Sequence, residues 1–420
     1  MAGFTRSRML LATGAAGVLL ALAACTPTPT LTPTEAPAPE PYSGPAAFIG
    51  DELELFLLTP EEITGLIPDA TEIATSSALT MVSDGGGAPA TPAICDVLYA
   101  EQSLGSVAAR VVEWKSQSDS EQRLGRLLVL QFPDEAHVEE RMDQLTAAAE
   151  QCEQFDKEGA VTFDAVIADG DDHARAIAGT LVDTNAGHDW RQFSAYASAG
   201  NVLVTLWQPF DGDQSFDAEV AADLLAARAD EAHSALLEKL TAMPPVVEDL
   251  PAGDASKPWS EWAITVAGVG PVRLGEPVET AVAAAGVSAT PPEFAGGWWT
   301  LEEPGGAGSM LVFPVEGGGA VLGVTVGSDR SSLPDPQDGA GLPAADGIRV
   351  GDPVSAAVAA YPGGTTVRVI SSADHWYAVP DRDGRLLRFR TDRDADDPQA
   401  IIVGITVEDA TAWRGLRFTD

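Results

Sequence analysis

The chain has 420 residues, enough for two or three domains, and 45% of them are hydrophobic, so it can form real cores. It carries 63 acidic and 24 basic residues, for a net charge of −39 that is spread along the chain. Nucleic acid and anionic lipid are bound by clusters of lysine and arginine, which this sequence lacks, so the composition excludes both as direct ligands.

Residues 1–24 predict a lipoprotein signal peptide. Arg6 and Arg8 precede an apolar run from Met9 to Ala24 that is too short to remain as a membrane anchor. The run ends in Leu22-Ala23-Ala24-Cys25, which resembles the bacterial lipobox. The resemblance implies that a diacylglycerol is attached to the Cys25 sulfur, that cleavage makes Cys25 the first mature residue, and that the protein is anchored on the extracytoplasmic face of the cell membrane. An ordinary secretory signal followed by a chance cysteine is the alternative.

Residues 25–46 are rich in threonine and proline and almost free of apolar side chains. Such a segment cannot bury a core, so we expect a disordered, partly polyproline II tether. At about 3.1 Å per residue it reaches about 60 Å, which lifts the folded part away from the membrane.

The first folded region is predicted at residues 47–243. Thr59 is placed to cap a helix that begins at Pro60, and Glu62 completes a capping box. Further helices are predicted from Pro133 to about Cys152 and from Asp217 to about Leu240. Strands are predicted at 107–114, 127–132, from 161, and in a meander at 175–182, 192–199 and 201–208. This order indicates an α+β fold with a mostly antiparallel sheet and packing helices.

Once Cys25 is lipidated, Cys95 and Cys152 are the remaining cysteines. An even pair in an oxidising exterior predicts one disulfide, and two buried thiols are the alternative. The sequence has no pair of closely spaced cysteines and no cluster of cysteine and histidine, so it does not support a structural zinc site.

Several motifs of this region carry a family resemblance. Leu58-Thr59-Pro60-Glu61-Glu62 follows a leucine-rich segment, Gln131-Phe132-Pro133-Asp134-Glu135-Ala136 opens the helix that ends in Cys152, and an amphipathic helix closes the region. Over most of residues 50–243 the chain resembles the extracellular sensor domain of actinobacterial PknH-type serine/threonine kinases. The resemblance implies that a ligand binds in a cleft without catalysis. Family members usually carry two disulfides, whereas this chain can form one. The sequence shows no kinase motif, so signalling would pass through a partner.

A Pro- and Asp-rich linker at 244–258 precedes a region at 259–420 that contains an internal repeat. Residues 272–284 match 348–360, Trp298-Trp299 matches Trp376-Tyr377, and 321–326 match 402–407, which defines units at about 262–330 and 345–410. Each unit is predicted to be a short strand, a helix that starts at a Gly-Glu-Pro or Gly-Asp-Pro motif, and three strands. The pattern resembles the tandem αβ repeats of the beta-lactamase inhibitory protein and of related outer-membrane assembly lipoproteins. It implies helices on one face of an antiparallel sheet and protein binding on the other.

Aromatic residues make up 6% of the chain, so their clustering is informative. Trp298, Trp299, Trp376 and Tyr377 occupy matching places in the two units, and in alternating strands one of each pair must face away from the helices. The outward residue either contributes to a binding interface or packs on a partly shielded surface. Trp190 and Trp207, in the meander of the first region, either line a cleft or pack in its core.

The common catalytic motifs of nucleophilic hydrolases, nucleotide-binding enzymes and zinc peptidases are absent from the sequence. The cluster Asp169-Gly170-Asp171-Asp172-His173 reads as an acidic turn rather than a metal site. Asp392 to Asp397 imitates the start of a calcium loop, but the sixth position is not glycine and the twelfth is Val403 rather than glutamate. We therefore expect no metal, no cofactor and no enzyme activity.

Together these features predict a lipid-anchored extracytoplasmic protein that binds an envelope ligand or an extracytoplasmic protein. A protein-directed inhibitor or envelope assembly factor that acts through the repeat sheet is the alternative, and an envelope hydrolase is the third.

Overall fold

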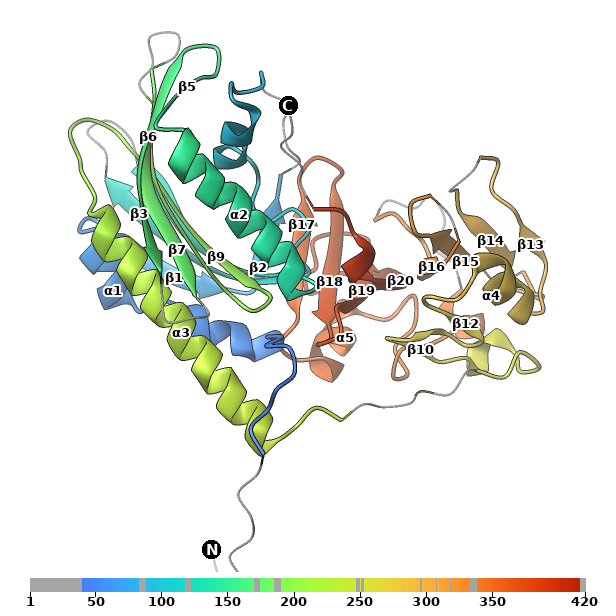
Figure 1. Ribbon diagram of the computed structural model, residues 1–420. Helices are drawn as coiled ribbons and strands as arrows, with labels where there is room; N and C mark the ends of the chain where they lie inside the picture. The colour runs from blue at the N-terminus through green and yellow to red at the C-terminus, as the bar shows by residue number, and fades with distance from the viewer. Residues whose placement is uncertain are drawn as a thin grey trace, which may run out of the picture. The chain divides into compact units, whose positions relative to one another are not determined.

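The computed structural model (Figure 1) describes residues 40–82, 88–117, 122–169, 174–184, 190–246, 250, 253–294, 297–306, 308–317, 319–331 and 338–415. The signal peptide, Cys25 and most of the predicted tether lie outside these residues. In the described part of the chain, no helix is both long enough and apolar enough to cross a membrane.

The first region contains an antiparallel sheet of eight strands in the order β1-β3-β4-β9-β8-β7-β6-β5. The prediction of an α+β fold built on a mostly antiparallel sheet is confirmed. The strands are β1 (Thr71–Ser76), β3 (Ala108–Gln117), β4 (Gln122–Gln131), β5 (Gln154–Asp156), β6 (Ala160–Asp169), β7 (Arg175–Asp183), β8 (Trp190–Ala199) and β9 (Val202–Phe210).

The helices of this region begin where their capping residues predict. In α1 (Pro60–Leu66), Thr59 Oγ1 accepts a hydrogen bond from the Glu62 N–H at 3.2 Å, and the Glu62 carboxylate accepts one from the Thr59 N–H at 2.7 Å. Asp134 caps α2 (Glu135–Gln151) and Asp217 caps α3 (Ala218–Ala242). The described residues of this region also form the 3₁₀ helices η1 (Gly50–Phe56) and η2 (Ala93–Leu98).

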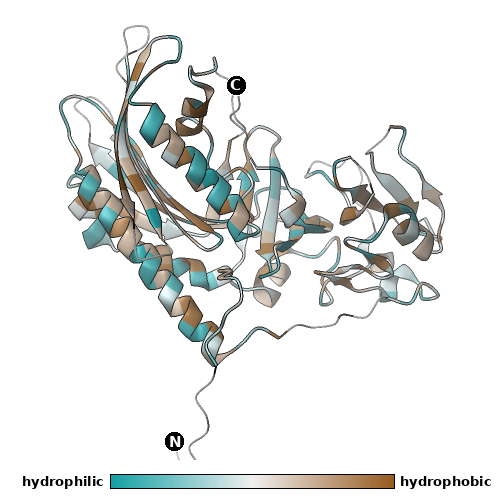
Figure 2. Ribbon diagram, viewed as in Figure 1, coloured by the Kyte–Doolittle hydropathy of each residue, from teal (hydrophilic) through white to brown (hydrophobic). Residues whose placement is uncertain are grey.

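The two long helices cover opposite faces of the sheet. Alternate residues of β4 enter two different cores, with Leu127 and Val129 in the core beneath α3 and Leu128 and Leu130 in the core beneath α2. This alternation follows from the two-residue side-chain period of a strand. In Figure 2 the helices carry both hydrophilic and hydrophobic bands, while the strands between them are largely hydrophobic.

The repeat region forms a sheet of nine strands in the order β13-β14-β15-β16-β20-β19-β18-β17-β2. Helices α4 and α5 share one core on a single face of this sheet, as predicted. After its helix each unit contributes four strands to this sheet rather than the three predicted, because β13 and β17 follow the helix directly. The elements are α4 (Val278–Ala284), β13 (Ala289–Thr290), β14 (Trp299–Glu302), β15 (Ser309–Pro314), β16 (Val321–Gly327), α5 (Val354–Ala360), β17 (Thr365–Val369), β18 (Asp374–Pro380), β19 (Arg385–Thr391) and β20 (Ile402–Asp409).

Shorter elements complete the region: a three-stranded sheet of β10 (Ile264–Thr265), β11 (Gly268–Val269) and β12 (Val272–Arg273), and the 3₁₀ helices η4 (Trp259–Glu261), η5 (Gly339–Gly341) and η6 (Ala410–Ala412).

The two repeats join symmetrically at their last strands. β16 and β20 pair antiparallel, and Thr325 lies opposite its repeat equivalent Thr406. Their hydroxyl oxygens are hydrogen-bonded at 2.8 Å. On either side, Gly323 pairs with Glu408 and Gly327 pairs with Gly404. Gly404 is the repeat equivalent of Gly323 and Glu408 is that of Gly327, so each glycine of β16 lies opposite the repeat equivalent of the other. The pairing therefore places a local two-fold axis between the two threonines.

The ninth strand of the repeat sheet comes from the first region. β2 (Ala78–Met81) pairs in parallel with β17, and the core beneath α2 continues into the repeat sheet through Leu79, Val367 and Leu386. Thr365 Oγ1 donates to the Ala109 carbonyl at 3.1 Å and accepts from the Ala109 N–H at 2.9 Å. The chain from Pro41 to Asp420 accordingly forms one compact unit, a link that the sequence pattern does not predict.

Candidate functional site

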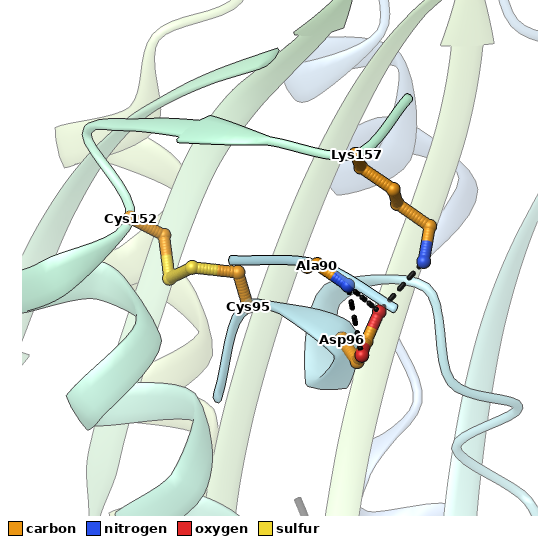
Figure 3. Close-up of a disulfide and its surroundings, with 5 residues drawn as sticks. All are labelled: Ala90, Cys95, Asp96, Cys152 and Lys157. Atoms are coloured by element: carbon orange, nitrogen blue, oxygen red, sulfur yellow. Dashed lines mark hydrogen bonds and ion pairs between the residues drawn. A yellow bond between two sulfur atoms is a disulfide. The ribbon is translucent and has the colours of Figure 1, made fainter. Parts of the chain in front are cut away.

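The predicted disulfide between Cys95 and Cys152 is present and joins η2 to the end of α2 (Figure 3). Beside it, the Asp96 carboxylate accepts hydrogen bonds from the Ala90 N–H and lies 2.6 Å from Lys157 Nζ. Both sulfurs are buried. The disulfide and the ion pair together fix η2 and the segment that follows it against the rest of the first region.

That following segment, Tyr99–Gln102, forms one wall of a pocket of about 320 Å³. Its floor is the face of the sheet that carries α2, where β4, β9 and β8 lie side by side. The pocket is lined by Val82, Leu98, Tyr99, Ala100, Glu101, Gln102, Arg126, Leu128, Trp190, Gln192, Tyr196, Thr205, Leu206 and Trp207. This volume lies at the lower end of the range for small-molecule sites, about 300–1,000 Å³.

Aromatic side chains line much of this pocket. Trp190 stacks on Tyr99, with ring centroids 6.3 Å apart and an angle of 26° between the planes. Trp207 lies beneath Arg126, whose guanidinium carbon is 5.3 Å from the ring centroid. Trp190 and Trp207 both line the pocket and are partly exposed, and Trp190 also packs against the core beneath α2.

Tyr99 is fixed by its surroundings. Its hydroxyl donates to Asp183 at 3.3 Å, and Lys157 Nζ lies 4.5 Å from its ring centroid. Burial, together with the negative charge and hydrogen bond of Asp183, raises the pKa of the Tyr99 phenol far above its usual range. The phenol is therefore a neutral hydrogen-bond donor at physiological pH.

The charged groups of the pocket are Arg126 and Glu101. Arg126 lies directly opposite Trp207 in the pairing of β4 with β9. Its Nη2 is 3.7 Å from Glu101 Oε2, an ion-pair distance but longer than a hydrogen bond. Glu101 Oε1 accepts hydrogen bonds from the Ser103 N–H and hydroxyl. Arg126 Nε is buried and has no hydrogen-bond partner among the residues that the structure describes.

Sequence reasoning missed both charged residues. The predicted strand starts at Leu127, one residue after Arg126, and Glu101 lies in a loop that has no regular pattern. A strand predicted to begin a few residues earlier would have placed Arg126 on the face opposite that of Leu127 and Val129.

Among the described residues, burial raises the pKa of two carboxyls, those of Asp381 and Glu408. Asp381 accepts hydrogen bonds from the N–H groups of Asp383 and Arg385 in the turn between β18 and β19. Glu408 is paired with Arg388. Neither carboxyl lines the pocket around Arg126.

The aromatic pairs of the repeats alternate as expected, but their surroundings differ. Tyr377 is buried, and Trp299 packs against the same core beneath the helices. Trp298 is 47% exposed, with its ring 5.8 Å from that of Phe313. Trp376 packs against the core beneath α2, which continues from the first region into the repeat sheet. The outward aromatic residue of the second unit, Trp376, is therefore packed inside the protein, whereas that of the first unit, Trp298, is exposed to solvent.

Among the described residues no group of three His, Cys, Asp or Glu side chains could hold a metal ion. Residues 170–173 of the first acidic cluster lie outside the described ranges. In the second cluster Asp392 pairs with Arg393 at 2.9 Å and Asp394 pairs with Arg368 at 3.4 Å.

No family model matches the chain, and no curated protein matches it. Among solved structures it is similar to the extracellular domain of PknH from Mycobacterium tuberculosis, with 18% identity and a TM-score of 0.29, over 46% of this chain and 98% of that domain. It is also similar to an uncharacterized protein from Mycobacterium smegmatis, with 13% identity and a TM-score of 0.26, over 44% of this chain and 97% of that one.

Proposed function

We propose that the protein is a lipid-anchored extracytoplasmic binding protein of the sensor type, which recognises a small envelope-derived ligand without catalysis. The ligand occupies the pocket between Tyr99–Gln102 and strands β4, β8 and β9. Cys25 carries the lipid, and any signal passes to a protein partner.

One observation supports this function above the others. Arg126 lines a pocket walled by aromatic rings, and within the described part of the chain its Nε is a buried donor without a hydrogen-bond partner. An unsatisfied buried donor costs about 1–3 kcal/mol, and a ligand that supplies an acceptor recovers that cost. The disulfide that fixes the pocket wall also suits an oxidising location outside the cytoplasm.

Thermal unfolding tests this function. A ligand that binds only the folded protein raises its melting temperature, by several degrees when the ligand is well above its Kd. We expect a low-molecular-mass fraction of the bacterial envelope to raise the melting temperature of the full-length protein and to have little effect on Arg126→Gln. Equal shifts in the two proteins, or no shift in either, would contradict the assignment of the pocket.

A second candidate is protein docking on the repeat sheet, as in an inhibitor or an assembly factor. It is favoured by the exposed Trp298 beside Phe313, because exposed tryptophan is enriched at interface hot spots. A photo-crosslinking residue in place of Trp298 would then give one discrete protein adduct in cells. The same residue in place of Val246, which is 84% exposed, serves as the control. No adduct specific to position 298 would count against docking there.

A further inference from the structure

We propose that the pocket around Arg126 binds a neutral saccharide of one or two rings. This inference rests on the proposed function and names the chemical class of its ligand. It follows from the charge balance, the hydrogen-bonding groups, the aromatic walls and the size of the pocket.

The charges of the pocket argue for a neutral ligand. Arg126 is balanced by Glu101 at 3.7 Å, and Glu113 lies opposite Arg126 in the pairing of β3 with β4, so a second carboxylate shares this face of the sheet. The chain as a whole carries −39, which repels anions. A cationic ligand would meet the guanidinium of Arg126. The negative surroundings therefore disfavour an anion, and contact with the guanidinium disfavours a cation.

The hydrogen-bonding groups argue for hydroxyls. Arg126 lines the pocket, and its Nε is a buried donor that has no hydrogen-bond partner among the described residues. Beside it lies the carboxylate of Glu101, which can only accept when ionised. A ligand group that both donates and accepts can serve the two at once. Neighbouring hydroxyls do so, since each carries one donor and two acceptor lone pairs. A purely apolar ligand would leave Arg126 Nε unsatisfied.

The aromatic walls argue for a ring. Trp190 and Trp207 are partly exposed and line the same pocket as the charged pair. A sugar ring has C–H groups on its faces and hydroxyls at its rim, so it can pack against the parts of these indoles that Arg126 and Tyr99 leave exposed while its rim meets Arg126 and Glu101. The volume of about 320 Å³ limits the occupant to a small unit rather than a long chain buried along its length.

Isothermal titration of the full-length protein tests this class of ligand. The probes are glucose, galactose, arabinose, N-acetylglucosamine, maltose and cellobiose, compared with glucuronate, galacturonate and octanoate. We expect at least one neutral sugar to bind more tightly than its uronate and than octanoate. Arg126→Gln should weaken that sugar about tenfold, and Trp207→Leu about three- to tenfold.

Matched controls separate the pocket from the surface. Arg123→Gln changes an arginine on the same strand that pairs with Asp211 outside the pocket, and Trp298→Leu changes an exposed tryptophan of the repeats. Both should bind sugar as the unaltered protein does. Glu101→Gln keeps an acceptor for Ser103 but removes the balancing charge, so it should raise the affinity for the matching uronate about tenfold.

The outcomes distinguish the two proposals. If a uronate or octanoate binds better than every neutral sugar and the binding depends on Arg126, the ligand class is wrong while the pocket function stands. If neither the envelope fraction nor any probe binds in a way that depends on Arg126, both proposals fail.

Discussion

Glu52 illustrates how single side chains hold the two regions of this protein together. It is 7% exposed and receives hydrogen bonds from Lys239 of α3, from Arg382 of the β18–β19 turn and from the Ile49 N–H. Burial alone would raise the pKa of this carboxyl, but these three hydrogen bonds outweigh burial and hold the pKa below its ordinary value of 4.5. The charged form is therefore the one that the folded state prefers.

We expect Glu52→Gln to lower the free energy of unfolding by about 2 kcal/mol at pH 7, because it removes charge-assisted hydrogen bonds. A carboxyl whose pKa is lowered on folding contributes stability above its unfolded pKa and loses that contribution as the pH falls through the folded pKa. The difference between the two proteins should therefore shrink below about pH 4.5. Urea unfolding at several pH values measures it, with the exposed Glu54→Gln as control. A difference that is constant down to pH 2 would refute the role of the charge.

At the scale of elements, two links position the pocket and the repeat sheet. The disulfide joins η2 to α2 and so places Tyr99–Gln102 over the sheet. The strand β2 lies in the repeat sheet and is followed at once by Val82, which lines the pocket. The pocket therefore depends on contacts that are far from it in sequence.

Replacing both Cys95 and Cys152 with alanine opens a loop whose ends are 57 residues apart. In the chain-entropy account this lowers the free energy of unfolding by about 4 kcal/mol. Urea unfolding of the variant and of the oxidised protein gives the difference. Ligand-dependent stabilisation should also fall, since the pocket wall loses its anchor. An unchanged unfolding midpoint would show that the cross-link contributes little.

Breaking the pairing of β2 with β17 tests the second link. The Met81 carbonyl accepts the Ile370 N–H at 3.0 Å, so the N–H of Met81 faces the same edge, and proline at this position removes that donor. Hydrogen exchange of residues 366–370 should become faster in Met81→Pro, while β20 stays protected. Thr80→Val, which keeps every backbone N–H, is the control. Unchanged exchange in β17 would mean that β2 adds little to the sheet.

For the molecule as a whole, local sequence patterns predict much of the fold, and long-range pairing does not follow from them. The first helix was predictable from its cap at Thr59, the helix that ends at Cys152 from the spacing of its apolar residues, and the repeat because its helix motif recurs. The strand β2 has four residues, and its partner β17 lies far along the chain, so no local pattern reveals their pairing. For the same reason sequence reasoning names Trp190 and Trp207 but not Arg126: a tryptophan stands out by its rarity, whereas a buried unpaired nitrogen is visible only in the folded structure.

The proposed lipid anchor makes a prediction at this scale. Because acyl chains bind the membrane by about 0.8 kcal/mol per buried CH₂, Cys25→Ser should move the protein from the membrane fraction to the medium. The protein with alanine at Cys95 and Cys152 should stay in the membrane fraction, since those cysteines form the disulfide. Immunoblots of the two fractions measure this. A Cys25→Ser protein that remains membrane-bound would rule out lipid at that residue as the anchor.

The central claim is that the pocket around Arg126 holds a small ligand, and native mass spectrometry of the full-length protein from an actinobacterial host tests it most directly. The account predicts a reproducible extra mass that is lost on denaturation, absent from Arg126→Gln and retained in Arg123→Gln. An extra mass that survives in Arg126→Gln, or a bare polypeptide that also gains no mass from envelope extract, would contradict it.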